Sequence, residues 1–224
     1  LAGAYLASPV GLLADHRTGA GERLSVTLED GSILELNTAT AVSTDYSRRQ
    51  RRIELHTGEV FLQVHENADR PFVVDAGAAR VEVLGTAFAV RRSADGVDVI
   101  VTESKVSVTA PDREAAIVTA GQSVKVTDTG LSPVADANEQ TALAWRRGRL
   151  VFESRPLSEV LSELDRYRPG RILIVDGALQ HIPVTGSFAN DRSDAALDTI
   201  ERTLPVRLVR LSDFLVLVFA DDES

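Results

Sequence analysis

The sequence contains neither cysteine nor methionine. Without cysteine the chain forms no disulfide, no thiolate metal site and no cysteine nucleophile. A translated reading frame starts with methionine, whereas this sequence starts with Leu1, so we interpret it as one piece of a longer protein. The uncharged segment Leu1–Ala14 is broken by Ser8-Pro9 and is too short to span a bilayer. We expect residues 1–20 to be the residual end of a membrane helix or a tether, with a tail docked on the fold as the alternative.

Basic residues are in the minority, with 24 Lys and Arg against 33 Asp and Glu and a net charge of −9 at pH 7. A negative field of this kind disfavours nucleic acid and anionic lipid as partners. The densest basic run is Arg48–Arg52, in which only Gln50 is not an arginine. We interpret this run as a solvated hairpin tip that protects a strand edge, with an acidic protein partner as the open alternative.

Common catalytic and metal-binding motifs are also absent. The sequence has no P-loop, no G-x-S-x-G and no H-E-x-x-H pattern. Its histidines, which are His16, His56, His65 and His181, do not have metal-ligand spacing. We therefore expect no metal, no cofactor and no conventional enzyme active site.

What is present is a long series of strand patterns. Leu24–Leu28 and Leu34–Leu36 alternate with polar residues around Asp30-Gly31, a pair that favours a hairpin turn. Similar patterns then recur about every ten residues, at Arg52–His56, Glu59–His65, Phe72–Asp75, Val81–Leu84, Ala87–Arg91, Val97–Thr102, Val106–Thr109, Ala116–Thr119 and Val124–Val126. They predict a β-sandwich or irregular stacked-sheet domain over residues 21–132.

The pattern changes beyond this domain. Residues 133–148 predict a helical linker, and residues 149–224 alternate strand and helix as βαβ followed by βαββ. The expected strands are Leu150–Phe152, Ile172–Val175, Val184–Phe188, Val206–Val209 and Phe214–Phe219, and the expected helices are Pro156–Tyr167 and Ser193–Leu204, with Ser193 as N-cap. The chain is thus predicted to be mainly β plus α/β, in two domains.

Gly85-Thr86 interrupts one of the strand patterns. A glycine at this place lets the backbone bend or bulge between Val81–Leu84 and Ala87–Arg91. A threonine hydroxyl beside a strained peptide bond can attack the preceding carbonyl and form an ester that water then opens. From these residues alone, a structural role for the glycine is favoured.

Several blocks of residues occur in a characteristic order. These are Val26–Ser32, Arg52–Leu55, Gly58–Phe61, Pro71–Val74, Val83–Val90, Ala120–Gln122, Ala144-Trp145, Leu150–Phe152 and Pro156-Leu157. The set resembles the FecR family, membrane-spanning anti-sigma factors that regulate extracytoplasmic-function sigma factors, over residues 23–167. One departure is Glu103-Ser104-Lys105, where the family usually has an acidic residue followed by glycine.

Residues 149–220 are similar to a second known domain. This is the short secretin and TonB-receptor amino-terminal (STN) domain, which has the same repeated βαβ plan. The similarity rests on Pro156-Leu157, Val184–Gly186 and Ala196-Leu197. We therefore expect an STN-like domain to follow the FecR-type domain.

The FecR resemblance implies a place and a role. The chain would be the periplasmic part of an anti-sigma factor that an upstream helix anchors in the inner membrane. An absent cytoplasmic domain would hold the sigma factor. The signal would come from the signalling domain of a TonB-dependent outer-membrane receptor, often one that takes up a ferric siderophore, and envelope proteases would then free the sigma factor.

The resemblance also implies candidate site residues. Some family members cleave themselves at a Gly-Thr bond by an N-to-O acyl shift, which makes Gly85 the carbonyl donor and Thr86 the nucleophile. For binding of the receptor by strand addition we expect the strands that contain Val184, Gly186, Phe188, Leu215, Leu217 and Phe219. The alternative function is a stand-alone periplasmic adaptor or ligand-binding scaffold, and a hydrolase is a distant third.

Overall fold

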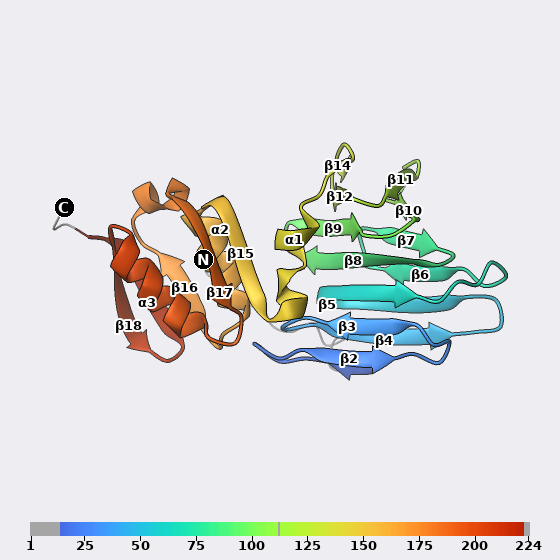
Figure 1. The fold of residues 1–224 in the computed structure, drawn as a ribbon, viewed down its shortest axis with the longest axis horizontal. Coiled ribbons are helices and arrows are strands. Elements are labelled where there is room, and N and C mark those ends of the chain that lie inside the picture. The colour runs from blue at the N-terminus through green and yellow to red at the C-terminus, as the bar shows by residue number, and fades with distance from the viewer. Residues whose placement is uncertain (1–13, 112, 222–224) are drawn as a thin grey trace. The chain divides into compact units, whose positions relative to one another are not determined.

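The structure is a computed structural model that describes residues 14–111 and 113–221. The predicted membrane-helix end, Leu1–Ala14, lies outside the described residues except for Ala14. The chain divides into two compact units, the first ending at Glu139 and the second beginning at Gln140 (Figure 1). This boundary falls within the segment predicted as a linker, which contains α1 (Glu139–Ala142) and the short 3-10 helix η2 (Ala144–Arg147).

The first unit is built from strands. They are β1 (His16–Arg17), β2 (Leu24–Thr27), β3 (Ile33–Leu36), β4 (Ala41–Tyr46), β5 (Arg51–Val64), β6 (Phe72–Asp75), β7 (Arg80–Val83), β8 (Thr86–Ser93), β9 (Gly96–Val101), β10 (Lys105–Thr109), β11 (Ala116–Thr119), β12 (Gln122–Thr127), β13 (Gly130–Leu131) and β14 (Ala135–Asp136). The strands pair continuously through β5, and the pairings divide there into one sheet of order β1-β4-β5-β6-β7-β10-β11 and another of order β2-β3-β5-β8-β9-β12. The short strands β13 and β14 both pair with β12.

Strand β5 belongs to both sheets. Its first part, from Arg51 to Thr57, pairs with β4 and β6, and its second part, from Gly58 to Val64, pairs with β3 and β8. The sequence predicted two strands here because Thr57-Gly58 resembles a turn. The structure has one strand instead, since Gly58 takes a φ of +90° and lies against Thr40, where a Cβ would come within 2.2 Å of Oγ1. The glycine therefore redirects the strand without ending it.

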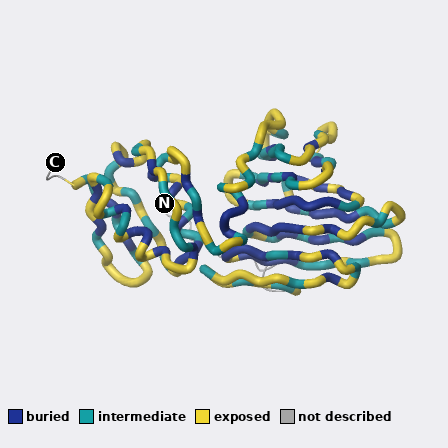
Figure 2. Tube along the Cα trace, in the orientation of Figure 1, coloured by how far each residue is buried: buried dark blue, intermediate teal, exposed yellow. Residues whose placement is uncertain are grey.

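The core of the first unit lies between the two sheets. Ile53 and Leu55 from the first part of β5 and Val60 and Leu62 from its second part are completely buried and belong to one apolar cluster. Figure 2 shows the middles of the strands buried and most of the turns exposed. This arrangement matches the predicted mainly β architecture of two stacked sheets.

Two local predictions for this unit need correction. Strand β4 was missed because Ser43, Thr44 and Asp45 put polar residues on both of its faces, which hides the alternation. The Asp30-Gly31 hairpin does form between β2 and β3, but its loop runs from Leu28 to Ser32 and only Gly31 has a positive φ, of +84°. The turn is therefore longer than the two-residue turn that the pair predicts.

The second unit contains two small sheets and two helices. Its elements are β15 (Arg149–Pro156), α2 (Leu157–Arg166), β16 (Arg171–Ile174), the 3-10 helix η3 (Gly177–His181), β17 (Pro183–Ala189), α3 (Ser193–Thr203), β18 (Val206–Ser212) and β19 (Leu215–Ala220). One sheet pairs β15 with β17, and the other has the order β16-β19-β18. Helix α2 contacts β15, β16 and β17, and α3 contacts β17 and β18. The helices therefore contact strands of both sheets.

The order of elements agrees with the predicted βαβ-βαββ plan, and the likeness to an STN domain stays a prediction. Helix α2 buries Leu157, Val160, Leu161 and Leu164, as its spacing predicts. The prediction that Ser193 caps α3 is wrong. Arg192 takes the cap position without a side-chain hydrogen bond, and Ser193 is the first helical residue, buried against the unit.

The described helices are short. The longest, α2 and α3, have 10 and 11 residues, whereas a membrane-spanning helix needs about 20. Within residues 14–111 and 113–221, no helix combines the length and the apolar character that crossing a bilayer demands.

Candidate functional site

Gly85-Thr86 lies where the chain passes from one sheet to the other. Strand β7 ends at Val83 in the first sheet, Leu84-Gly85 forms the connection, and β8 begins at Thr86 in the second sheet. A Cβ on Gly85 would lie 2.6 Å from the Cα of Glu66, which is too close for any side chain. Close approach of two backbone segments therefore requires glycine at this position.

The hydroxyl of Thr86 is held on one side. Thr86 is 7% exposed, and its Oγ1 donates a hydrogen bond to the carbonyl oxygen of Glu103. In the β5–β8 ladder Thr86 lies opposite Val64. The backbone of Gly85 does not take a positive φ, so the tightness of this site comes from packing. Thr86 is thus buried, with the Glu103 carbonyl oxygen as the hydrogen-bond acceptor of its hydroxyl, whereas Gly85 is partly exposed and Leu84 is 50% exposed.

Glu103 belongs to the turn where the sequence departs from the FecR pattern. Ser104 takes a φ of +57°, one of three non-glycine residues with positive φ among those described. Its carbonyl accepts a hydrogen bond of 3.0 Å from the Ala120 amide. The backbone at Ser104 is thus left-handed, a conformation that favours glycine, and for a serine it costs on the order of 1 kcal/mol. This strained residue is the neighbour of the one that holds the Thr86 hydroxyl.

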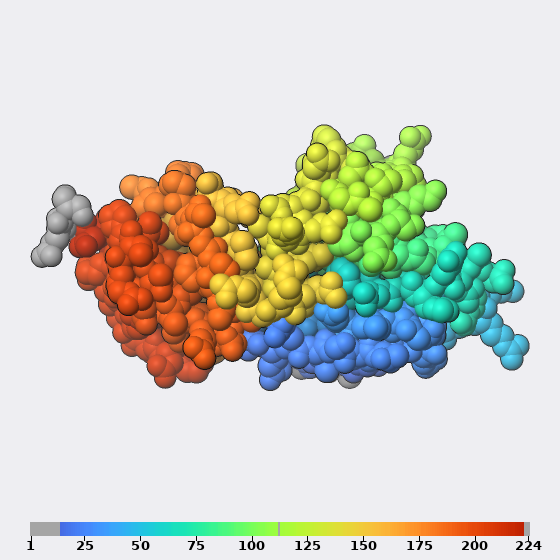
Figure 3. All heavy atoms as spheres, in the orientation of Figure 1, coloured from blue at the N-terminus to red at the C-terminus, as the bar shows by residue number. Residues whose placement is uncertain are grey.

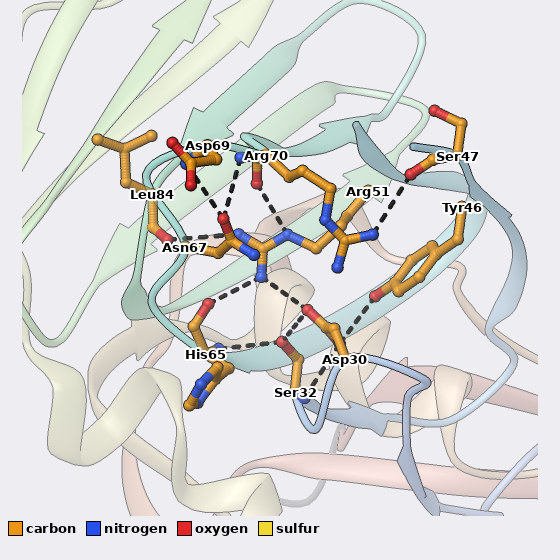
Figure 4. Close-up of polar contacts among 10 residues, drawn as sticks. All are labelled: Asp30, Ser32, Tyr46, Ser47, Arg51, His65, Asn67, Asp69, Arg70 and Leu84. Carbon is orange, nitrogen blue, oxygen red and sulfur yellow. Dashed lines mark hydrogen bonds and ion pairs between the residues drawn. The ribbon is translucent and has the colours of Figure 1, made fainter. Parts of the chain in front are cut away.

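A completely buried arginine, Arg51, contacts the connection between β7 and β8 at Leu84 (Figure 4). Arg51 has no exposed area, and its Nη1 forms an ion pair of 2.7 Å with Oδ2 of Asp30, whose side chain is 4% exposed. We name Asp30, Ser32, Tyr46 and Arg51 the Arg51 cluster. Its acidic member also accepts hydrogen bonds from the Ser32 hydroxyl at 2.7 Å and the Tyr46 hydroxyl at 3.2 Å. The buried charges are thus paired and hydrogen-bonded, as a low-dielectric interior requires.

The guanidinium of Arg51 also joins three backbone segments. It donates to the carbonyl oxygens of His65 at 2.8 Å and Arg70 at 2.9 Å, and its Nη2 lies 3.4 Å from that of Leu84. The Asn67 amide donates to the same Leu84 carbonyl at 2.9 Å. The Cζ atom of Arg51 is 5.3 Å from the ring centre of Phe72, a cation–π distance. Arg51 therefore fixes the residue that precedes Gly85.

The cluster shifts the acidity of its members. Burial raises the pKa of the Asp30 carboxyl, but hydrogen bonds from Arg51 and Ser32 outweigh burial and leave that pKa below its ordinary value. Burial, with the negative charge of Asp30 beside it, raises the pKa of the Tyr46 phenol. At neutral pH the cluster therefore holds an ionised Asp30 and a protonated Tyr46.

Arg51 corrects the interpretation of the basic run. Arg48 and Arg49 are exposed at the β4–β5 turn, as a solvated tip predicts, but Arg51 is in the core. The alternation contained the signal, because Arg51 lies in phase with the buried residues Ile53 and Leu55. Sequence reasoning missed the cluster since its partners are spread from residue 30 to residue 84.

The candidate partner-binding strands lie in different environments. On β17, Val184 is buried, and Phe188 packs against Phe152 with ring centres 6.1 Å apart. A Cβ on Gly186 would lie 3.2 Å from the Phe188 ring. In the described residues β15 is the sole strand neighbour of β17, so β17 has one edge without a strand.

Strand β19, by contrast, is the central strand of its sheet. It pairs with β16 on one side and with β18 on the other, so strand addition at β19 is not available. Its residues Leu215, Leu217 and Phe219 alternate with the fully buried Val216 and Val218 and are partly exposed. These three side chains therefore lie on the opposite face of the sheet from the buried pair.

The histidines do not form a metal site. His56 Nε2 lies 2.8 Å from the hydroxyl of Ser43, and its Nδ1 is 3.6 Å from a carboxylate oxygen of Glu54. Among the described residues, no three histidine, aspartate or glutamate side chains gather in a way that would hold a metal ion.

Comparison with known proteins gives two results. Residues 14–107 match the sequence model of the FecR family, described as FecR protein, which confirms the predicted resemblance for this segment. Two crystal structures, each of a putative anti-sigma factor from Parabacteroides distasonis, resemble most of the chain. The first is 24% identical with a TM-score of 0.78 and covers 92% of this chain and 98% of its own. The second is 25% identical with a TM-score of 0.77 and covers 92% and 97%. No curated protein matches the sequence significantly.

Proposed function

We propose that this chain is the signal-receiving, periplasmic part of an anti-sigma factor that regulates an extracytoplasmic-function sigma factor. The observation that carries the proposal is the FecR match over residues 14–107, which contains both Gly85-Thr86 and the Arg51 cluster. The likeness of 92% of the chain to solved structures named as anti-sigma factors supports it further. In this role a cytoplasmic domain holds the sigma factor, and a membrane helix joins that domain to the present chain.

The proposed source of the signal is the signalling domain of a TonB-dependent outer-membrane receptor, in the setting of ferric siderophore uptake. The small α/β unit offers a physical route for this contact at the edge of β17 that pairs with no described strand, where Arg149 Nη2 donates to the Ser187 carbonyl at 3.1 Å and an added strand would displace it. The Asn190 amide donates to the Gly148 carbonyl, and by alternation along the ladder Ser187 directs its N–H away from β15. An extended strand of the receptor domain can pair with such an edge, where main-chain hydrogen bonds supply affinity.

The contact is tested by titrating the purified chain with the isolated signalling domain of such a receptor in a calorimeter. Ser187→Pro removes the outward N–H and is expected to abolish binding, whereas the matched control Ser187→Ala keeps the N–H and is expected to bind as the unaltered chain does. Both variants lose the 2.8 Å hydrogen bond from Arg149 Nε to the serine hydroxyl, so that loss cancels. Equal binding by both variants would place the contact elsewhere.

We also propose a single-turnover self-cleavage at the bond between Gly85 and Thr86. The Thr86 hydroxyl oxygen attacks the carbonyl carbon of Gly85, and its proton passes by way of solvent to the nitrogen as the C–N bond breaks. An ester then links Gly85 to the Thr86 oxygen, and Thr86 carries a free amine. Water hydrolyses the ester, which leaves a carboxylate on Gly85 and restores the hydroxyl. Close packing of Gly85 against the Glu66 backbone and the burial of Thr86 support the proposal, because both restrict how the Gly85–Thr86 bond can move.

Mass spectrometry of freshly purified, denatured protein tests this step. Two fragments that meet at Gly85 and Thr86 are expected, and Thr86→Ala is expected to give one intact chain. Thr86→Ser retains a hydroxyl and serves as the matched control, for which cleavage is expected to persist. A single intact species from the unaltered chain, identical to that of Thr86→Ala, would rule out self-cleavage.

A further inference from the structure

The three-stranded sheet of the second unit carries an apolar face that points away from the helices. Residues directed toward the helices, Val206, Val216 and Val218, are buried. On the opposite face the pairing register forms the rows Arg171–Leu215–Ser212 and Leu173–Leu217–Val209 across the strands β16, β19 and β18. A third row contains Phe219 and Arg207, together with Val175, which directly follows β16 and donates its amide to the Val218 carbonyl at 2.9 Å. We name these nine residues the outer sheet face.

The outer sheet face is open to solvent and apolar in its centre. Leu173 is 46% exposed and Val175 is 50% exposed. In Figure 3 the atoms of α3 form part of the visible surface of the second unit, and α3 contacts β18. A sheet that buries one face under helices and leaves an apolar second face exposed is typical of an interaction surface.

Charge on this face is of one sign. Its two charged residues are Arg171 and Arg207, and none of the nine is acidic, although the chain as a whole carries −9. Arg171 Nη1 lies 3.6 Å from Oδ2 of Asp165 on α2, but the Arg171 side chain is 68% exposed, so an acidic partner can still reach it. The guanidinium of Arg207 lies 5.2 Å from the ring centre of Phe219, so it stands over the apolar surface. A partner that complements this face must therefore be apolar in the centre and acidic at its margins.

The edges of the same sheet are closed to strand addition. A carboxylate oxygen of Asp165 on α2 accepts the Ile172 amide of β16 at 2.7 Å. A carboxylate oxygen of Glu201 on α3 accepts the Leu208 amide of β18, also at 2.7 Å. An added strand would have to displace both carboxylates, which is a common protection of sheet edges. A partner of this sheet therefore contacts its face.

The two arginines define the shape of that partner. They stand at diagonal corners, two strands and four residues apart, which corresponds to about 16 Å with spacings of about 4.8 Å and 3.3 Å. Along an α-helix the same distance is about eleven residues, or three turns. We propose that the outer sheet face binds an amphipathic helix of a partner protein, with its apolar stripe on Leu173 and Leu217 and with acidic residues about three turns apart on Arg171 and Arg207.

A pair of designed peptides tests this proposal on the full chain. Both are helical, about 20 residues long, and carry a leucine stripe. One has glutamate at two positions eleven residues apart on the flanks of the stripe, and the other has lysine there. By fluorescence anisotropy the glutamate peptide is expected to bind about tenfold more tightly than the lysine peptide, since each peripheral ion pair contributes modestly.

Charge reversal then identifies the contact. Arg171→Glu combined with Arg207→Glu is expected to invert the preference between the two peptides. The matched control, Arg192→Glu combined with Arg202→Glu, makes the same charge change at exposed positions on and before α3 and is expected to keep the preference. Leu173→Ser is expected to weaken the binding of both peptides, because it removes an exposed apolar side chain from the middle row of the surface.

Other outcomes would overturn the proposal. Equal binding of both peptides to the unaltered chain would show that the face does not select an acidic helix. The same inversion of preference in the control variant would show this too. If sedimentation shows a dimer that Leu173→Ser dissociates, a second copy of the chain occupies the face. The Ser187→Pro variant separates this inference from the proposed receptor contact, since it alters the β17 edge and is expected to bind the glutamate peptide normally.

Discussion

Replacing Arg51 with methionine tests the role of the Arg51 cluster in holding the first unit together. Methionine fills much of the same volume but leaves the Asp30 carboxylate buried without a cationic partner. It also removes the donors to the carbonyl oxygens of His65 and Arg70. Removing one partner of a buried ion pair costs about 3–5 kcal/mol. This is a large part of the roughly 5–15 kcal/mol by which a typical domain is stable.

The neighbouring Arg52 supplies the matched control. Its Nη2 forms an ion pair of 2.9 Å with Asp75, but the two side chains are 35% and 29% exposed. Arg52→Met is therefore expected to cost no more than about 1 kcal/mol. The same substitution at adjacent positions of one strand thus has two different expected costs.

The cost of Arg51→Met is also expected to depend on pH. Because the folded protein holds the pKa of Asp30 below its ordinary value, this group stabilises the fold above its unfolded pKa of about 4. That contribution is lost as the pH falls through the folded pKa. Without Arg51, burial raises the pKa of Asp30 and the sign reverses. The difference in stability between variant and unaltered chain should therefore begin to shrink as the pH falls toward about 4, where the carboxyl of the variant takes up its proton, and shrink further below about 4, where the unaltered chain loses its contribution.

Urea unfolding followed by far-ultraviolet circular dichroism measures these differences. The fluorescence of the single tryptophan, Trp145, belongs to the second unit and provides an internal control. The double variant Arg51→Met, Asp30→Asn carries no unpaired buried charge and is expected to be more stable than Arg51→Met alone. A loss below about 1 kcal/mol for Arg51→Met, or a double variant less stable than the single one, would refute this account of the cluster.

Three further substitutions have defined outcomes. Gly85→Ala is expected to lower stability by about 1–3 kcal/mol, because its Cβ would collide with the backbone of Glu66, and a thermal midpoint equal to that of the unaltered chain would contradict the packing. Ser104→Gly is expected to raise stability by about 0.5–1 kcal/mol in urea unfolding, since glycine relieves the positive φ; a loss would mean that the serine side chain matters. Burial raises the pKa of Asp165 despite its hydrogen bond from Ile172. Asp165→Asn should therefore raise the thermal midpoint at pH 7, with the gain vanishing below about pH 4, and a gain independent of pH would exclude this cause.

Much of the fold could be predicted from the sequence because alternation is a local signal. Strands such as β9 and β12 place a buried valine at every second position, and this pattern is visible without knowledge of their neighbours. Strand β4 was not predicted because its polar residues fall on both faces and break the alternation of apolar and polar positions. The continuity of β5 was not predicted because a glycine between two strand patterns usually indicates a turn. The contact of Gly58 with Thr40, which is distant in the sequence, explains the glycine instead.

The candidate site was likewise predictable only in part. The position of Gly85-Thr86 is readable as a motif, whereas its surroundings depend on residues far apart in the chain, namely Glu66 and Glu103. For β19 the alternation of Leu215, Leu217 and Phe219 predicted a strand with two faces. It could not tell a central strand from an edge strand, since that depends on which strands pair with it.

The double membership of β5 has a consequence for how the first unit opens. Much of this strand has neighbours on both sides, β4 and β6 in one sheet and β3 and β8 in the other. Neither sheet can separate from the other without breaking hydrogen bonds of β5 itself. Local opening at the margins should therefore leave β5 protected, and its amide hydrogens should exchange with solvent only when the whole unit unfolds as one cooperative block.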